Sequence, residues 1–400
     1  MDLFQKRNYL NYINRERKGE LILEKLEIYL LEGTLGDLPE KWNVQDIAKF
    51  HYSNIMKSLY LTDFPEAWKD GDMKNYMCTI GANDYFNKWT GEEFMPLEGT
   101  SLENLYSFVN KELADGSIVE GKKTGLPICG GNHQLLFYNK KYTDKVPETM
   151  EELIQFSEEA KKKHNLEYGF TMPTGGVYFI LPFLYGFGAD LWSTDNEAIP
   201  FEPLKKTIIM LKELIYDKKI LPVKWEEPES VAYFKEQRSA YCIGGDWNIH
   251  EFDEASGHNL GVCEIPKLER ECRSTANANY LFVTKHLKPE LYENVEKLCK
   301  KMLSDEVQTQ IMKELYRMPA SVNYKMDTSQ FDELMIKSYE IHKKAFIMPP
   351  LQSVTHMYHV LADMLEPNVI IRDTPEKLAE KVIYHLTDVK SYYENNLIKL

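Results

Sequence analysis

Hydrophobic positions recur along the chain at helical spacing in three long segments. Residues 147–165 and 200–221 each show an amphipathic helical pattern, and the apolar, aromatic run at 177–186 predicts a third helix. Thr149, followed three residues later by Glu152, predicts a capping box at the start of the first of these helices. These segments predict helices of ordinary length for a globular protein.

Short apolar runs between the helices predict strands. They lie at 76–84, within 122–141, and in the segments that begin at Ser239, Leu260 and Asn279. Strands that alternate with helices indicate an α/β fold. Because no linker rich in Gly or Ser separates the halves, we expect two lobes joined by several chain crossings.

The first 75 residues show a different pattern, polar and helical. Residues 17–33 and 43–61 carry apolar side chains at helical spacing, with Asn43 as a candidate N-cap. We therefore predict an atypical helical segment at 1–75. A helix–turn–helix interpretation of 20–61 leaves a cytoplasmic ligand-sensing regulator open as an alternative. Residues 1–75 as a whole have 11 basic and 13 acidic residues, so no basic face dominates.

Charge and hydropathy narrow the function further. The 400-residue chain has 48 basic and 62 acidic residues, a net charge of −14, which argues against a nucleic-acid partner. No run of about 18 apolar residues predicts a membrane span. The N-terminus has the basic charge of a secretory leader but no apolar run, so the chain as written predicts a cytoplasmic protein or one that has lost its leader.

Composition gives no sign of a metal or cofactor. The six cysteines form no CxxC pair, and no cysteine–histidine spacing predicts a zinc site. Phosphate-binding glycine loops and hydrolase motifs are also absent from the sequence. The abundant aromatics, 25 Tyr, 18 Phe and 6 Trp, are typical of cores and also of sugar sites, where flat rings pack on pyranose faces.

Four segments, in order, resemble family 1 extracellular solute-binding proteins. GLPICGGNHQLLFYNKKY at 125–142 resembles the strand that crosses the family's hinge and the strand that follows it. YFKEQRSAYCIGGDWNIHEF at 233–252 resembles its glycine turn before a Trp. The family's later strands are similar to LGVCEIPKL, which begins at Leu260, and to the segment that follows it as far as 324. The family's last cleft helix is similar to FIMPPLQSVTHMYHVLADML at 346–365. The similarity extends over about 76–400.

The resemblance implies a two-lobed periplasmic-binding-protein-like fold of class II. It implies a first lobe built from 76–132 and 276–325, and a second lobe from 133–275 and 326–400, with the helical segment 1–75 as a departure. It further implies a monomeric carbohydrate-binding protein that delivers its ligand to an ABC transporter permease, outside the cell or at its surface, without catalysis or a cofactor.

The resemblance also implies ligand-binding positions. Sugar hydroxyls need carboxylate or amide partners, and sugar faces need aromatic rings. Each position has a structural alternative: a helix N-cap or a turn for the polar residues, and core packing for the aromatic ones. The implied residues are Asp84, Asn132, Tyr178, Asp246, Trp247, His356 and Tyr358.

Cys129 leaves an enzyme open as an alternative. LPIC is similar to the hinge strand of thiaminase I enzymes, which carry a nucleophilic cysteine there. A cysteine nucleophile needs a base to form the thiolate, and Asp246, Glu251 or His250 are the candidates. The residues after Cys129 do not follow the enzyme pattern, so we expect a buried structural thiol.

Overall fold

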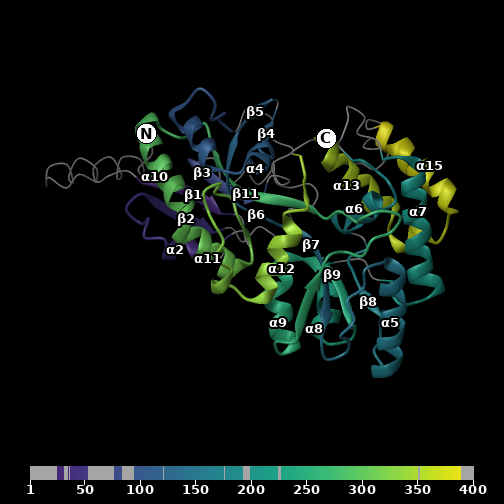
Figure 1. Cartoon of the computed structure of the whole chain (residues 1–400). Helices are drawn as coiled ribbons and strands as arrows, with labels where there is room; N and C mark the ends of the chain where they lie inside the picture. The colour runs from purple at the N-terminus through teal and green to yellow at the C-terminus, as the bar shows by residue number, and fades with distance from the viewer. Residues whose placement is uncertain are drawn as a thin grey trace, which may run out of the picture.

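The computed structural model has a mixed α/β fold with two main sheets (Figure 1). The residues that it describes are 25–30, 35, 37–52, 76–82, 94–119, 121–174, 176–191, 199–223, 227–349 and 352–388. The α/β class and the two-lobe organisation predicted from the sequence are confirmed.

The first sheet contains strands from distant parts of the chain. Late strand β11 lies between β3 and β6 and runs antiparallel to both, so the chain must return to this sheet after building the second one. The order is β12 (Met318–Pro319), β6 (Gly125–Gly131), β11 (Thr275–Val283), β3 (Cys78–Ala82), β1 (Leu26–Leu30) and β2 (Ala48–Tyr52), with β13 (Phe346–Ile347) beside the start of β11.

The helices predicted at 17–33 and 43–61 are wrong where the structure describes them, and the helix between them, α2 (Leu38–Lys41), is only four residues long. Leu26–Leu30 and Ala48–Tyr52 form β1 and β2, two parallel strands of the first sheet. Leu26, Ile28, Tyr29 and Leu30 are all buried, as is typical of a parallel strand covered on both faces. The helix–turn–helix interpretation is wrong for the same reason. The remainder of both predicted helices lies outside the described residues.

Short helices cover the first sheet. They include α2 (Leu38–Lys41), the 3₁₀ helix η4 (Ser101–Phe108), α4 (Lys111–Asp115), η7 (Pro289–Leu291), α10 (Tyr292–Met302) and α11 (Asp305–Leu315). A small hairpin of β4 (Ile118–Val119) and β5 (Lys122–Lys123) leads into β6. Their apolar faces share one core with the strands, which makes this half a packed unit.

The second sheet is buried on both faces. Its strands, in order, are β10 (Leu260–Cys263), β7 (Gln134–Asn139), β9 (Tyr241–Gly245) and β8 (Phe170–Thr171). Separate apolar cores flank it. The elements around it are α5 (Met150–His164), with the predicted capping box of Thr149 and Glu152, α8 (Glu227–Lys235), η6 (Asp246–Asn248), α9 (Ile249–Ser256), η8 (Thr328–Gln330) and α12 (Glu333–His342).

A group of helices packs together beside the second sheet and around a core of its own (Figure 1). The predicted helix at 177–186 is confirmed, and the one at 200–221 is confirmed except that it closes in a π-helical turn. We call this set the helical group: α6 (Val177–Gly186), α7 (Phe201–Lys212) with η5 (Glu213–Asp217), α13 (Gln352–Met364), α14 (Pro367–Ile370) and α15 (Pro375–Thr387).

The chain passes between the sheets where β6 leads into β7 and where β10 leads into β11. Gln134, fully buried, ties these two crossings together: its amide nitrogen donates to Thr275 Oγ1 (2.6 Å), and its amide oxygen accepts from the Thr275 backbone N–H (2.8 Å). A third connection follows β12. Side chains from the two halves therefore meet along one seam at these crossings.

Candidate ligand-binding site

The turn between the two sheets needs residues that tolerate left-handed backbone. Gly131 has φ +135° and Asn132 has φ +50°, the second being a conformation that Asn adopts more readily than most residues. The half-buried Asn132 lies between β6 and β7. Its carbonyl oxygen accepts a hydrogen bond from the Tyr178 hydroxyl, so the start of α6 is fixed to the crossing.

Tyr178 and Trp247 lie side by side, with ring centroids 6.2 Å apart. Tyr178 is at the start of α6, and its hydroxyl also donates to the Thr275 carbonyl (2.9 Å). Trp247 follows β9, and its ring lies across Gly245, where an added Cβ would come within 2.3 Å of the indole. Both rings are half-buried and thus keep some surface for a ligand.

The carboxylate of Asp246 is fully buried. Its Oδ1 lies 2.6 Å from Arg317 Nη1, and its Oδ2 lies 3.2 Å from His133 Nδ1. Burial alone raises the pKa of Asp246, but the charge of Arg317, followed by His133, outweighs burial and lowers the pKa below its usual value. Asp246 is therefore held as a carboxylate inside the protein.

Arg317 and His133 were missed by the sequence prediction. Arg317 stands 71 positions after Asp246 and is 8% exposed at its side chain. His133 is fully buried and contacts the Ser338 hydroxyl at 3.2 Å. The nearby His342 has its pKa lowered to about 3 by burial, and it therefore stays neutral near pH 7. No local spacing connects these residues, because they come from separate elements.

The structure thus brings four of the seven predicted residues together at the seam. We call them, with the two missed residues, the junction site: Asn132, His133, Tyr178, Asp246, Trp247 and Arg317. Asp84 lies outside the described residues. A ligand role for any of these positions stays a prediction.

The two residues predicted on α13 belong to the helical group instead. His356 is buried, and its Nε2 lies 2.9 Å from the His385 carbonyl oxygen of α15. Burial lowers the pKa of His356. The half-buried Tyr358 donates its hydroxyl to the sulfur of Met348 at 3.0 Å. Both side chains thus contact their own helical group.

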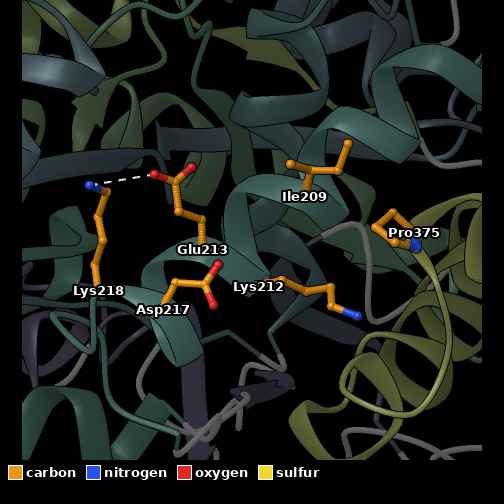
Figure 2. A pocket seen from close by; sticks show the side chains of 6 residues that line it. All are labelled: Ile209, Lys212, Glu213, Asp217, Lys218 and Pro375. Atoms are coloured by element: carbon orange, nitrogen blue, oxygen red, sulfur yellow. Dashed lines mark ion pairs between the residues drawn. The ribbon is translucent and has the colours of Figure 1, made fainter.

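A surface hollow of about 470 Å³ lies beside α7 (Figure 2), and none of the predicted residues lines it. Lys212 at its rim donates to the carbonyls of Ile370 (3.0 Å) and Asp373 (2.8 Å), and Lys218 pairs with Glu213 at 3.5 Å. The ammonium groups of Lys212 and Lys218 thus interact with groups of the protein itself. The hollow is lined by Ile209, Lys212, Glu213, Asp217, Lys218 and Pro375.

The enzyme alternative finds no support at Cys129. This thiol is fully buried on β6, and burial raises its pKa to about 11. The candidate bases are engaged elsewhere: Glu251 pairs with Lys235, and Asp246 pairs with Arg317. In the described part of the chain, no three His, Cys, Asp or Glu side chains are grouped to hold a metal ion.

The seam between two α/β lobes defines a class of two-lobed binding proteins, and comparison with known families agrees. Residues 58–342 match the family model of the bacterial extracellular solute-binding proteins. This match covers more than half of the chain, and the protein belongs to that family. No curated protein sequence matches the chain significantly.

Solved structures show the same fold at low sequence identity. The MalE maltose/maltodextrin-binding domain of Bdellovibrio bacteriovorus, bound to maltotriose, has 19% identity and a TM-score of 0.77, with 92% of this chain and 99% of that one covered. The GacH receptor of Streptomyces glaucescens, solved unliganded and with acarbose, has 18% identity and a TM-score of 0.78, with 93% and 98% covered. Maltose-bound MalE3 of T. maritima has 17% identity and a TM-score of 0.74, with 91% and 100% covered.

The family is extracellular by description. Among the helices that the structure describes, none combines the length and the apolar character that a membrane crossing requires.

Proposed function

We propose that this protein binds a carbohydrate at the junction site and delivers it to an ABC importer. The observation that carries the proposal is the pair of half-buried rings of Tyr178 and Trp247, 6.2 Å apart at the seam between the lobes. Adjacent aromatic faces with neighbouring polar groups suit the mixed apolar and hydroxylated surface of a sugar.

The similar structures favour this ligand class. Those proteins were solved with maltotriose, acarbose and maltose bound, all of them carbohydrates. For this chain we propose that Trp247 and Tyr178 stack on the sugar and that Asn132 supplies polar contacts. The buried Asp246 acts indirectly, by holding its neighbours. Closure of the lobes around ligand would follow from tighter binding in the closed state.

Family membership supports the proposed partner and location. We propose a monomer outside the cell or at its surface, with an ABC permease as partner. The lobes would be 76–132 with 276–325, and 133–275 with 326–400, and the described strands β1 and β2 add to the first.

Calorimetric titration with maltotriose, maltose and acarbose tests the proposal. We expect at least one to bind, and we expect Trp247→Ala to weaken that binding. A ring that loses ~50–80 Å² of apolar surface contributes roughly 1–2 kcal/mol, or about ten- to thirtyfold in Kd. Tyr384→Ala, at an exposed aromatic on α15, is the matched control and should leave Kd unchanged.

Either of two results would contradict the proposal. One is the absence of binding across a broad carbohydrate panel that includes these three sugars. The other is a Trp247→Ala protein whose Kd equals that of the unmodified protein.

A further inference from the structure

A buried ion pair connects the two sheets beside Trp247. Arg317 immediately precedes β12, which pairs with β6 in the first sheet. Asp246 immediately follows β9, which pairs with β7 in the second sheet. Their closest atoms, Arg317 Nη1 and Asp246 Oδ1, are 2.6 Å apart, and the two side chains are 8% and 0% exposed. The pair is therefore a contact between the lobes that is shielded from solvent.

The crossing turn leaves space for this pair. A Cβ at Gly131 would lie 2.7 Å from Asp246 Oδ2 and 2.9 Å from Arg317 Cδ. The Asp246 backbone N–H also donates to the His133 carbonyl oxygen at 3.0 Å. Asp246 is thus fixed to the crossing by its backbone, and to the first lobe by its carboxylate.

Trp247 lies beside both partners of the pair. Trp247 is the next residue after Asp246. The hydrogen-bonded backbone of Asp246 therefore fixes the position of the Trp247 backbone, from which the indole extends. The guanidinium carbon of Arg317 lies 6.0 Å from the indole centroid, and the Tyr178 and Phe179 centroids lie 6.2 Å and 6.1 Å from it. A guanidinium beside an aromatic ring is a favourable contact that restricts the ring's orientation.

We infer that Arg317 is a positioning residue for the ligand: by pairing with Asp246 and lying beside Trp247, it holds the indole in the orientation that carbohydrate stacking requires. This inference rests on the proposed function. The pair lies at the chain crossings, where rotation of the lobes displaces atoms least.

Three variants separate positioning from simple stabilisation. Arg317→Met leaves the Asp246 carboxylate buried without its cation. Arg317→Met combined with Asp246→Asn removes both charges, so the penalty of an unpaired charge disappears. Arg317→Lys keeps the charge but loses the planar fork. Arg273→Met is the matched control, because Arg273 lies 5.4 Å from the ring of Phe346 instead.

The measurements are the thermal melt, acrylamide quenching of Trp247, and the Kd for maltotriose. Each background is paired with its Trp247→Phe version, so that the difference isolates Trp247 from the other tryptophans. We expect Arg317→Met to melt at lower temperature, expose Trp247 to quencher and weaken Kd about tenfold. The double variant should recover its melt but keep the exposed indole and the weak Kd, and Arg317→Lys should fall between. Arg273→Met should match the unmodified protein in quenching and Kd.

A double variant that recovers quenching and Kd together with its melt would overturn the inference, because Arg317 would then only balance a charge. Unchanged quenching in every foldable variant would overturn it as well. If Arg317→Met does not fold, quenching and Kd of the double variant and of Arg317→Lys still test the inference. If no sugar binds the unmodified protein, the proposed function fails, while the quenching of Trp247 without ligand still decides whether Arg317 positions the indole.

Discussion

The ion pair of the junction site and the core of the helical group are both buried, but different forces hold them. The junction site depends on directed polar contacts between Asp246, Arg317 and His133. The helical group is a packed apolar core with fully buried side chains such as Leu361 and Leu378. Apolar cores tolerate substitutions that keep their volume, whereas a buried polar network loses most when one partner is removed. A change in the ion pair should therefore alter both stability and binding, and a change in the apolar core of the helical group should alter stability alone.

The largest expected effect is in Arg317→Met, whose free energy of unfolding should fall by an amount that depends on pH. This effect tests the contrast between the two regions most directly. Removal of one partner of a buried ion pair costs about 3–5 kcal/mol near pH 7. In the unmodified protein the pKa of Asp246 is lowered, so its stabilising contribution is present above the unfolded value near 4 and is lost as the pH falls below it. Arg317 is the largest influence that opposes burial, ahead of His133, so we expect its removal to raise this pKa and favour the protonated acid.

The difference in unfolding free energy between the unmodified protein and Arg317→Met should therefore shrink as the pH falls from 7 to 4.5. Urea unfolding at the two pH values measures it. His342, with a pKa lowered to about 3, remains neutral at both. A difference that stayed constant or grew on acidification would show that Asp246 is not the group left without a partner.

The next largest effect is expected at the crossing turn. Gly131→Ala adds a Cβ within 2.7 Å of the Asp246 carboxylate, at φ +135°, and should cost about 3 kcal/mol from strain and overpacking. Gly188→Ala is the matched control, since Gly188 also has positive φ, +105°, but an added Cβ would meet no atom within 4 Å. It should cost about 1 kcal/mol. Equal losses in denaturant unfolding would mean that the ion pair does not need the space beside Gly131.

The helices of the second half of the molecule could be predicted from the sequence, because caps and apolar spacing mark them locally. Thr149 and Glu152 lie three residues apart, and their capping box is present. β1 was misread because Leu26, Tyr29 and Leu30 fit helical spacing, although Leu26, Ile28 and Leu30 also alternate as in a strand. A five-residue strand is too short for periodicity to decide between the two. Arg317 could not be found, because its partner Asp246 lies 71 positions away and only the folded chain joins them.

A smaller effect tests the helical group. His356→Ala removes the contact between His356 Nε2 and the His385 carbonyl oxygen, and should cost about 1–2 kcal/mol of stability. Because His356 is buried against α15, we expect the Kd for the cognate sugar to stay unchanged in calorimetry. Tyr358→Phe, which removes only the hydroxyl contact with Met348, should likewise leave Kd unchanged. A clear loss of affinity in either variant would support the ligand role predicted from the sequence and would contradict the contrast between the two regions.

The smallest effect is expected at Cys129, which lies on β6 close to the junction but takes no part in its ion pair. Its sulfur accepts a weak hydrogen bond from Asn279 Nδ2 at 3.6 Å, and burial raises its pKa to about 11, so the group is a thiol at neutral pH. A thiol is a poor nucleophile, because the thiolate is the reactive form. Cys129→Ala should cost about 1 kcal/mol of stability, from a small cavity, and change the sugar Kd by less than about twofold.

Thermal melts and calorimetry check both values, and an assay for thiamine cleavage with the unmodified protein checks the enzyme alternative. Detectable cleavage that disappears in Cys129→Ala would show a catalytic cysteine and contradict the binding-protein proposal. A stability loss without cleavage places Cys129 with the apolar core of the first lobe, where its neighbours on β6 and β11 already pack. The boundary between the polar junction and the surrounding core would then lie between Cys129 and Gly131, two residues apart on the same strand.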